Sequence, residues 1–498
     1  MSKAIAKGDG AVVEIRRDTG APIHREIAES LRRAIEGGLL APGARLASTR
    51  ALAQDWSVSR NTVLQAFEIL ISEGYAVGRV GAGTYVAETP PLGDLGACGD
   101  DATAAPPPGG YPFRGLSRRG RRLAGGGLAE IAERPLPFMP DAPDYREFPL
   151  RAWLRLTSEV SAGLTGDAPN AMSSAGHAPL RQAIAHHVAV ARGLPCEAEQ
   201  VIVTTGSQQS LDLCARLMTD VGDPVWMEDP GYVGARAALL ANGCAVAGVP
   251  VDREGMDVGA AIEAMPAPKM ICVSPARQYP MGVTLSASRR RALLRFAAQA
   301  GAWIVEDDYD GEMRFTGPPP PALGSGDRAA RVILIGTFSK TLLPSLRLGY
   351  LIAPPDLAES FAAARTAAQG HSPLLEQMAL AEMMHRGLYA AHLRRMRTLY
   401  RERQQALVAA LVETLGYVPP AGELDGGMHL LLPFRDGADD VSAARALARS
   451  GVVARPLSPY ARAPGGRAGL LLGFAAFRPE EIARAAQRLS AVAGLVRA

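Results

Sequence analysis

The chain of 498 residues has few cysteines, few aromatic side chains and little excess charge. Its cysteines are scattered, with no C-x-x-C pair and no cluster with histidine, so neither a disulfide framework nor a metal site is predicted. Such a dispersed set fits a reducing cytoplasm. Aromatic residues make up only 5% of the chain, and a net charge of +3 is too small to indicate a nucleic-acid partner. Evidence for DNA binding therefore has to come from a local motif.

Long apolar runs are also missing. No stretch is long and apolar enough to span a bilayer. The opening letters MSKAIAKGDG lack the apolar segment of a secretory signal. We therefore expect a cytoplasmic protein with no membrane partner. The length exceeds what one compact core usually holds, so two or more domains are expected.

A segment without hydrophobic periodicity separates two parts of the chain. Residues 89–136 are dense in Pro, Gly and Ala and include the run DDATAAPPPGGYPFRG. Such a segment buries too little apolar surface to offset its ordering entropy, so it is interpreted as a flexible linker. The prediction is an N-terminal domain over residues 1–88 and a large C-terminal body over residues 137–498.

The N-terminal domain shows two helices joined by a very short turn. Ser48 is a plausible N-cap for a helix through Leu52 and Trp56, and the letters SVS form the turn. Arg60 opens the next helix, whose predicted core face is Val63, Phe67 and Leu70. An amphipathic helix over residues 23–37 precedes this pair, and the tail YAVGRVGAGTYVAE predicts a β-hairpin. Together they predict a helix-turn-helix followed by a wing.

This stretch resembles the GntR family of winged-helix regulators from about residue 22 to residue 88, although Ala47 stands where the family usually has proline. The resemblance implies a double-stranded DNA operator as partner. Guanidinium groups suit guanine or phosphate, and hydroxyls suit phosphate. By the family's pattern the DNA-binding residues are Arg45, Ser48, Arg50, Arg60, Thr62, Gly81 and Gly83.

In the body, short apolar runs alternate with helical stretches. The runs VIVTTG, PVWMEDPGY, KMICVSPA, AWIVEDDY and RVILIGTFSK each end at polar residues or at Gly or Pro. This alternation predicts an α/β fold with a mostly parallel sheet and crossover helices. Ligands of such sheets bind at the carboxyl ends of the strands, where these polar residues stand.

Lys340 follows one of these runs, and a lysine held at a strand end can condense with an aldehyde to form a Schiff base. Asp307 and Tyr309 stand two apart at another strand end and so share a face. Their carboxylate and phenol can bind a ring nitrogen and a ring hydroxyl. Tyr232 follows a third strand and can stack on a flat ring.

A phosphate site is predicted next to these residues. Gly206, Ser207 and Gln208 open a helix after a strand, where free N–H groups and the helix dipole favour an anion. Thr337 adds a hydroxyl donor and Arg347 a cation. Each signal is weak alone, but together they supply a Schiff-base lysine, a ring partner, a phosphate cradle and a stacking aromatic.

The constellation resembles the fold-type-I aminotransferases from about Pro137 onward, and the whole chain resembles the MocR/GabR-type regulators. The resemblance implies pyridoxal 5'-phosphate (PLP) as cofactor and a homodimer. Lys340 then forms the Schiff base, Asp307 binds the pyridine nitrogen, and Tyr309 binds the 3-hydroxyl. Tyr232 stacks on the ring. The residues around the phosphate are Gly206, Ser207, Gln208, Thr337 and Arg347.

Two positions depart from the aminotransferase pattern. Tyr279 stands in QYPMG where these enzymes often carry asparagine. Leu471 stands in LLLGF where they commonly carry the arginine that binds the substrate carboxylate. Either another arginine, such as Arg455 or Arg462, takes that role, or the ligand has no α-carboxylate.

Three functions follow from these patterns. The first is a transcription regulator whose body senses PLP, or an amine or amino acid that exchanges onto it at Lys340. The second is a working aminotransferase with an accessory DNA-binding domain, against which Leu471 argues mildly. The third is a cofactor-free scaffold that only dimerises the DNA-binding domain, and it is disfavoured by the retained cofactor chemistry. Effector identity, the operator, and activation or repression stay open.

Overall fold

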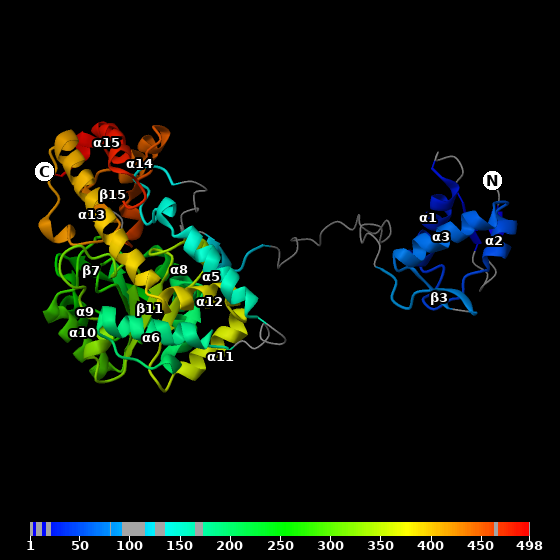
Figure 1. Cartoon of the computed structure of the whole chain (residues 1–498), viewed down its shortest axis with the longest axis horizontal. Helices are drawn as coiled ribbons and strands as arrows, with labels where there is room; N and C mark the ends of the chain where they lie inside the picture. The colour runs from blue at the N-terminus through cyan, green and yellow to red at the C-terminus, as the bar shows by residue number, and fades with distance from the viewer. Residues whose placement is uncertain are drawn as a thin grey trace, which may run out of the picture. The chain divides into compact units, whose positions relative to one another are not determined.

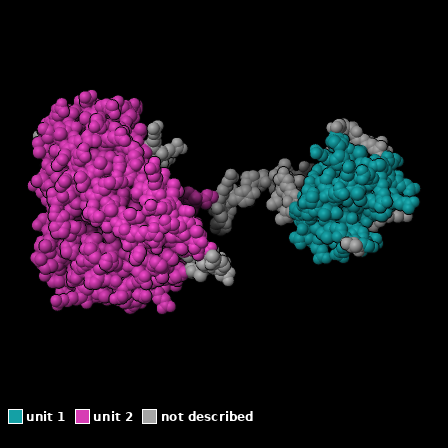
Figure 2. All heavy atoms as spheres, viewed as in Figure 1, with its two compact units in different colours: residues 1–114 teal, residues 115–498 magenta. Residues whose placement is uncertain are grey.

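A computed structural model describes residues 3–5, 12–15, 21–79, 81–91, 115–124, 135–164, 173–462 and 467–497. The chain forms two compact units, Met1–Arg114 and Gly115–Ala498 (Figure 2). Among the described residues, no helix has the length and apolarity needed to cross a membrane. The cysteines at positions 196, 214, 244 and 272 are free, while Cys98 lies outside the described residues.

The first unit is a winged helix-turn-helix, as predicted. Its helices are α1 (Ile23–Glu36), α2 (Thr49–Asp55) and α3 (Arg60–Ser72), and its hairpins are β1 (Lys3–Ile5) with β2 (Val12–Glu14) and β3 (Ala76–Arg79) with β4 (Gly83–Val86). Helix α3 packs against both α1 and α2. Val63, Phe67 and Leu70, the predicted core face of α3, are all buried.

Serine caps fix where the two helices of the motif begin. The Ser48 hydroxyl accepts a hydrogen bond from the Ala51 N–H at 3.2 Å, which confirms the predicted cap of α2. The Ser59 hydroxyl accepts from the Thr62 N–H at 3.1 Å and caps α3, a role that the sequence reading missed. Caps of this kind stabilise a helix by about 1 kcal/mol. They define the short turn between α2 and α3.

The second unit is built on a large sheet. Strand order is β5 (Val201–Thr204), β12 (Gly349–Ile352), β11 (Val332–Thr337), β10 (Trp303–Asp308), β9 (Met270–Val273), β6 (Pro224–Asp229), β7 (Ala245–Asp252) and β8 (Gly255–Met256). The run from β11 to β7 is parallel, as predicted. Strand β12 is antiparallel to both of its neighbours, and β8 is antiparallel to β7. The carboxyl ends of the parallel strands therefore meet at one edge.

Helices cover both faces of this sheet (Figure 1). Within β6, Met227 packs in a core with residues of α7 (Ser207–Met218), α8 (Val233–Ala241) and α11 (Ala358–Gln369). Its neighbour Trp226 packs on the other face with residues of α9 (Val258–Ala264) and α10 (Ala287–Ala300). Strands buried on both faces read as continuous apolar runs, as these do in the sequence. This layer also includes α5 (Leu150–Ala162), α6 (Ala178–Arg192) and α12 (Leu374–His385).

A smaller antiparallel sheet of β13 (His429–Pro433), β15 (Gly469–Gly473) and β14 (Arg455–Pro456) completes the unit with α14 (Asp440–Arg449) and α15 (Pro479–Ala486). The long helix α13 (Leu388–Leu415) packs against both α12 and α15 and so connects the two sheet layers.

One helix falls inside the segment predicted as a linker. Residues Arg118–Ala124 form α4, which contacts α8 of the second unit. The Ser117 hydroxyl accepts from the Gly120 N–H at 2.9 Å, which supplies a local start for this helix. The boundary between the two compact units lies within residues 89–136, before α4.

Candidate functional site

The predicted DNA-binding arginines of the first unit are exposed. Arg45, Arg50 and Arg60 present their side chains to solvent, and Thr62 is half-buried. Arg60 at the start of α3 donates from Nε to the Thr49 hydroxyl at 3.4 Å, which joins the beginnings of α2 and α3. The Thr62 hydroxyl lies 2.7 Å from the Ser59 hydroxyl, so part of its bonding capacity serves the cap.

Arg45 belongs to the wing side of the unit. Its backbone bridges to Tyr85 of β4, and its guanidinium lies against Gly83, where a Cβ atom would meet Nε at 3.2 Å. Gly81 and Gly83 have φ of 74° and 110°, which a β-hairpin tip reaches cheaply only with glycine. The structure therefore brings Arg45 together with the wing glycines. Arg60, Thr62 and the Ser48-capped helix, which carries Arg50, form a second group around the turn.

The predicted cofactor residues of the second unit stand at one edge of the large sheet. Thr337 is the last residue of β11, and Lys340 lies in the turn that follows. Asp307 ends β10 with Asp308, and Tyr309 comes directly after. Gly206 ends the β5–α7 connection, Ser207 begins α7, and Tyr232 stands at the N-cap position of α8 after β6. Four strand ends converge, as the parallel topology predicts.

At the phosphate end, Gly206 has φ of 126° and precedes the first turn of α7. A Cβ atom on Gly206 would lie 3.9 Å from the Thr337 hydroxyl oxygen, so these two predicted residues are neighbours. The Ser207 hydroxyl is buried and lies close enough to the Asp307 carboxylate to lower the pKa of that group. Gln208 donates from Nε2 to the Gly234 carbonyl at 2.9 Å, which ties α7 to α8. Arg347 is exposed, and its side chain makes no hydrogen bond or ion pair with the described part of the chain, whereas its backbone N–H donates to the Pro344 carbonyl.

At the ring end, two buried polar atoms lack partners. Within the described chain, neither Oδ1 of Asp307 nor the Tyr309 hydroxyl makes a hydrogen bond. Burial, reinforced by the negative charge of Asp308, raises the pKa of Asp307 to about 7, against the opposing influence of Ser207 and Lys340. Unpaired buried groups of this kind cost free energy unless a ligand satisfies them.

Lys340 contacts Asp141, which was not among the predicted site residues. Its Nζ donates to the backbone carbonyl of Asp141 at 3.0 Å. The Asp141 carboxylate accepts from the Tyr279 hydroxyl at 2.6 Å and from Arg455 Nη1 at 2.9 Å. Burial acts to raise the pKa of Asp141, but the charges of Lys340, His429 and Arg455 outweigh it, so the pKa lies below its usual value.

The two departures from the aminotransferase pattern meet beside this carboxylate. Leu471 is fully buried in a cluster with Tyr279 and Tyr460, and it pairs across the small sheet with Arg455. Arg455 is thus the candidate arginine that lies at the site. Arg462 instead binds the Val246 carbonyl and donates its backbone N–H to Asp229.

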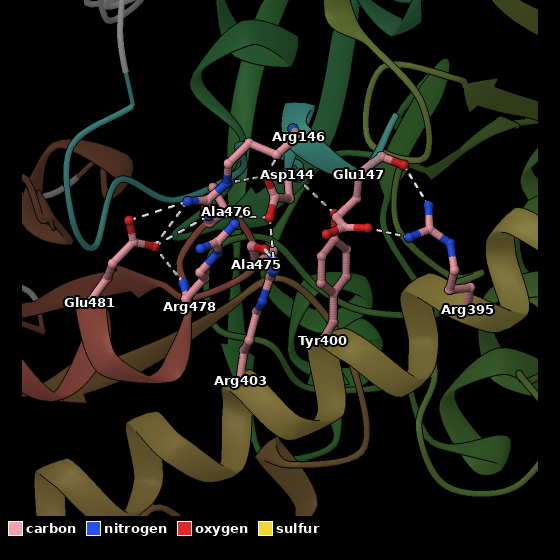
Figure 3. A network of polar contacts seen from close by, with 10 residues as sticks. All are labelled: Asp144, Arg146, Glu147, Arg395, Tyr400, Arg403, Ala475, Ala476, Arg478 and Glu481. Atoms are coloured by element: carbon pink, nitrogen blue, oxygen red, sulfur yellow. Dashed lines mark hydrogen bonds and ion pairs between the residues drawn. The ribbon is translucent and has the colours of Figure 1, made fainter. Parts of the chain in front are cut away.

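A polar network fixes the segment that carries Asp141 (Figure 3). The Asp144 carboxylate accepts from Arg146 and, at 2.7 Å, from Arg403 of α13, and the Asp144 N–H donates to the Tyr400 hydroxyl at 3.0 Å. Arg146 also donates to the Ala476 carbonyl at 2.7 Å. Three separate parts of the unit are therefore joined three residues after Asp141. The local sequence DAPDYREFP shows acidic residues in a loop but not which of them is buried.

Comparison with known families agrees with this geometry. Residues 141–489 match the family of class I and II aminotransferases, and residues 23–86 match the gntR family of bacterial regulatory proteins. In structure, the chain is similar to the α-aminoadipate aminotransferase LysN from Thermus thermophilus, with a TM-score of 0.67 and 29% identity over 75% of this chain and 96% of that one. That enzyme was crystallised with N-(5'-phosphopyridoxyl)-L-leucine.

Relatives along the full length are regulators. The chain is 40% identical to the probable rhizopine catabolism regulatory protein MocR of Rhizobium meliloti, over 93% of this chain and 92% of that protein. It is 32% identical to the pyridoxine biosynthesis regulator PdxR of Corynebacterium glutamicum, over 91% of this chain and 92% of the relative. The chain is therefore a member of the MocR-type DNA-binding transcription regulators, in which a gntR-type helix-turn-helix is joined to an aminotransferase-like domain of fold type I.

Proposed function

We propose that this regulator binds PLP at Lys340 and changes its binding to a double-stranded operator when PLP or an amine effector occupies the site. The observation that carries the proposal is a pair of buried atoms without hydrogen-bond partners, Asp307 Oδ1 and the Tyr309 hydroxyl, with the buried Ser207 hydroxyl next to Asp307. All three belong to residues predicted to hold the cofactor. In a folded protein such groups are nearly always satisfied, so a polar ligand between them is expected.

The residues present fit PLP. Lys340 supplies the amine for the covalent link, and Asp307 and Tyr309 offer a carboxyl and a phenol to the ring. Tyr232 offers an aromatic face, and its pKa is raised by burial and then by the charge of Asp307, which places the two side chains within electrostatic range of each other. The residues proposed to surround the phosphate are Gly206, Ser207, Gln208, Thr337 and Arg347. When bound, PLP supplies an aldehyde that can be shared between a lysine and a ligand amine.

Lys340 itself is placed to act as a switch. Its amine reaches the Asp141 carbonyl at 3.0 Å, so a lysine released by an incoming ligand amine has a hydrogen-bond acceptor in the folded protein. The segment of Asp141 is joined through Asp144 to α13 and to residues 475–481. We expect occupation of Lys340 to change the contacts that join the Asp141 segment to α13 and to residues 475–481. A ligand shifts a protein only through contacts that differ between its states.

DNA binding is proposed through Arg45, Ser48, Arg50, Arg60, Thr62, Gly81 and Gly83. A recognition helix in the major groove and a wing on the backbone are the usual geometry for this motif. We propose that the regulator acts in the cytoplasm and that it is a homodimer. A two-fold symmetric dimer would present two helix-turn-helix units to an operator with two half-sites.

A second candidate, sustained transamination, is favoured by one comparison. The 2-aminoadipate transaminase of Thermus thermophilus is 33% identical over 64% of this chain and 81% of that enzyme. Steady turnover of an amino donor with a keto acid would establish it. Ligand binding without turnover would leave the sensing role.

The test of the cofactor site uses the scarcity of lysine. The chain has four lysines, Lys3, Lys7, Lys269 and Lys340. After incubation with PLP and reduction with borohydride, we expect the mass of the cofactor on the peptide of Lys340 and no covalent adduct in Lys340→Ala. Lys269→Ala, which removes an exposed lysine, is the matched control. Reduced cofactor on Lys340→Ala at the wild-type level would refute the assignment.

A further inference from the structure

Asp141 has a backbone conformation that needs an explanation. Its φ of 68° lies in the left-handed region, which L-residues other than glycine adopt rarely, although aspartate and asparagine enter it more readily than most. Residues held in this way persist only where the surrounding structure determines them, and they gather at functional sites. Asp141 stands directly beside Lys340, whose amine its carbonyl accepts. Asp141 and the proposed cofactor lysine therefore form one site.

The surroundings of Asp141 hold both its backbone and its side chain. The network of Figure 3 anchors Asp144, with a buried ion pair to Arg403. The carboxylate of Asp141 is in turn held by Tyr279 and Arg455. The Asp141 side chain keeps 12% of its exposure and that of Arg455 keeps 26%, so a small molecule can reach both from solvent.

The charges at this wall are already balanced. Arg455 Nη1 lies 2.9 Å from the Asp141 carboxylate, and this arginine stands opposite Leu471 in the small sheet. Its cation is thus committed to an internal partner, and the neighbouring position offers only a leucine. A ligand carboxylate brought here would face the negative charge of Asp141, which is already paired with Nη1 of Arg455. A buried charge without a partner is strongly disfavoured.

A ligand hydroxyl, in contrast, would find uncharged hydrogen-bonding partners at this wall. The Tyr460 hydroxyl lies 3.2 Å from the Tyr279 hydroxyl and donates to it, because the one proton of Tyr279 goes to Asp141, and the Tyr460 oxygen keeps its acceptor capacity. Arg455 also reaches the Tyr279 hydroxyl at 3.4 Å. This wall consists of two phenols and a neutralised ion pair, which can bond to a hydroxyl without any counter-charge.

We infer that Asp141 is a specificity-determining residue that makes the Lys340 site select a primary amine bearing a hydroxyl group and no carboxylate beside the amine. This inference rests on the proposed function, since it names the ligand class of the same site. A diamine is disfavoured for the same reason as an amino acid, because its second ammonium would compete with Arg455 for the one carboxylate.

The test compares two amines that differ in a single group, L-alaninol and L-alanine. The protein is first loaded with PLP, and the change of the cofactor's absorption on adding each amine gives its apparent affinity. We expect the wild-type protein to prefer alaninol by about tenfold or more, which corresponds to about 1.4 kcal/mol. Preference for alanine, or no response to either amine, would overturn the inference.

Substitutions then assign the selectivity to Asp141. Asn tolerates the left-handed conformation, so Asp141→Asn should fold while freeing the charge of Arg455. The alaninol preference should fall about tenfold or reverse in this variant, and Arg455→Gln added to it should remove the gain for alanine. Asp436→Asn, at an exposed aspartate, is the charge-matched control. An unchanged ratio in Asp141→Asn would refute the role of this residue.

The outcome is separate from the test of the cofactor site. Absence of any PLP adduct at Lys340 defeats the proposed function, and the inference about Asp141 falls with it. An adduct at Lys340 with the wrong amine preference leaves the proposed function standing and defeats the inference alone.

Discussion

The two units place their functional residues in opposite environments. In the helix-turn-helix unit the predicted DNA contacts Arg45, Arg50 and Arg60 are exposed, whereas in the aminotransferase-like unit Asp307 and Tyr309 are buried, with atoms that lack partners. Solvated arginines give affinity only when a dense array of phosphates replaces their counterions. Buried unpaired groups instead reward one ligand of the right shape. The first unit is therefore expected to depend on salt and the second on pH and on the identity of the ligand.

The largest effect is expected where the second unit is most tightly bonded. Arg403→Ala removes one of the two arginines that bind the buried Asp144 carboxylate, together with the guanidinium that binds the Ala475 carbonyl, and breaking such a buried pair costs about 3–5 kcal/mol. Denaturant unfolding followed by tryptophan fluorescence measures it, because Trp153, Trp226 and Trp303 all lie in this unit.

The control for this comparison lies on the same helix. Arg395 of α13 pairs with Glu147 but is half exposed, and an exposed pair contributes only about 0–1 kcal/mol. Equal destabilisation by Arg395→Ala and Arg403→Ala would break the contrast between buried and solvated charge.

The next effect concerns pH in the cofactor-free protein. A folded-state pKa of about 7 for Asp307, above its unfolded value of 3.8, means that unfolding releases a proton in this range. The stability contribution of Asp307 therefore falls as pH rises from about 4 to about 7, on the order of 3 kcal/mol in total. In Asp307→Asn we expect a flatter dependence of unfolding free energy on pH. Identical slopes in the two proteins would contradict the assigned burial.

A smaller effect is expected on the DNA side. Arg60→Ala should weaken operator binding by about 1–3 kcal/mol and leave PLP loading unchanged, because Arg60 opens the recognition helix of the other unit. Binding titrations at several salt concentrations measure the affinity and its salt slope. Arg25→Ala, an exposed arginine of α1, serves as the matched control. Operator affinity that is equal for wild type and Arg60→Ala would remove this arginine from the interface.

The smallest effect concerns the cap of the recognition helix. Ser59→Ala removes the acceptor of the Thr62 N–H and should destabilise the start of α3 by about 1 kcal/mol. Amide hydrogen exchange in the first turn of α3 should then be roughly fivefold faster. Ser72→Ala, which removes a hydroxyl bond to the Ile69 carbonyl near the end of the same helix, should leave the first turn unchanged.

Local patterns made much of the molecule predictable. The position of Ser48 predicted a helix cap, and the spacing of Val63, Phe67 and Leu70 predicted a buried helix face. The apolar runs before Lys340 and Asp307 predicted strands of a parallel sheet. These features depend on neighbours within a few residues, so periodicity and capping rules suffice for them. Helix α4 was missed because its Arg- and Gly-rich letters show no apolar period.

The sequence by itself determined the order of the two units, the helix-turn-helix and the lysine at a strand end. Each of these features depends on patterns among residues that are close together in the sequence. Only the tertiary structure decided that Asp141 faces Lys340, that Arg455 rather than Arg462 reaches the site, and that Asp141 neutralises it. These partners lie 199 and 314 residues from Asp141 along the chain. Contacts at such separations follow from how strands and helices pack, and no local spacing records them.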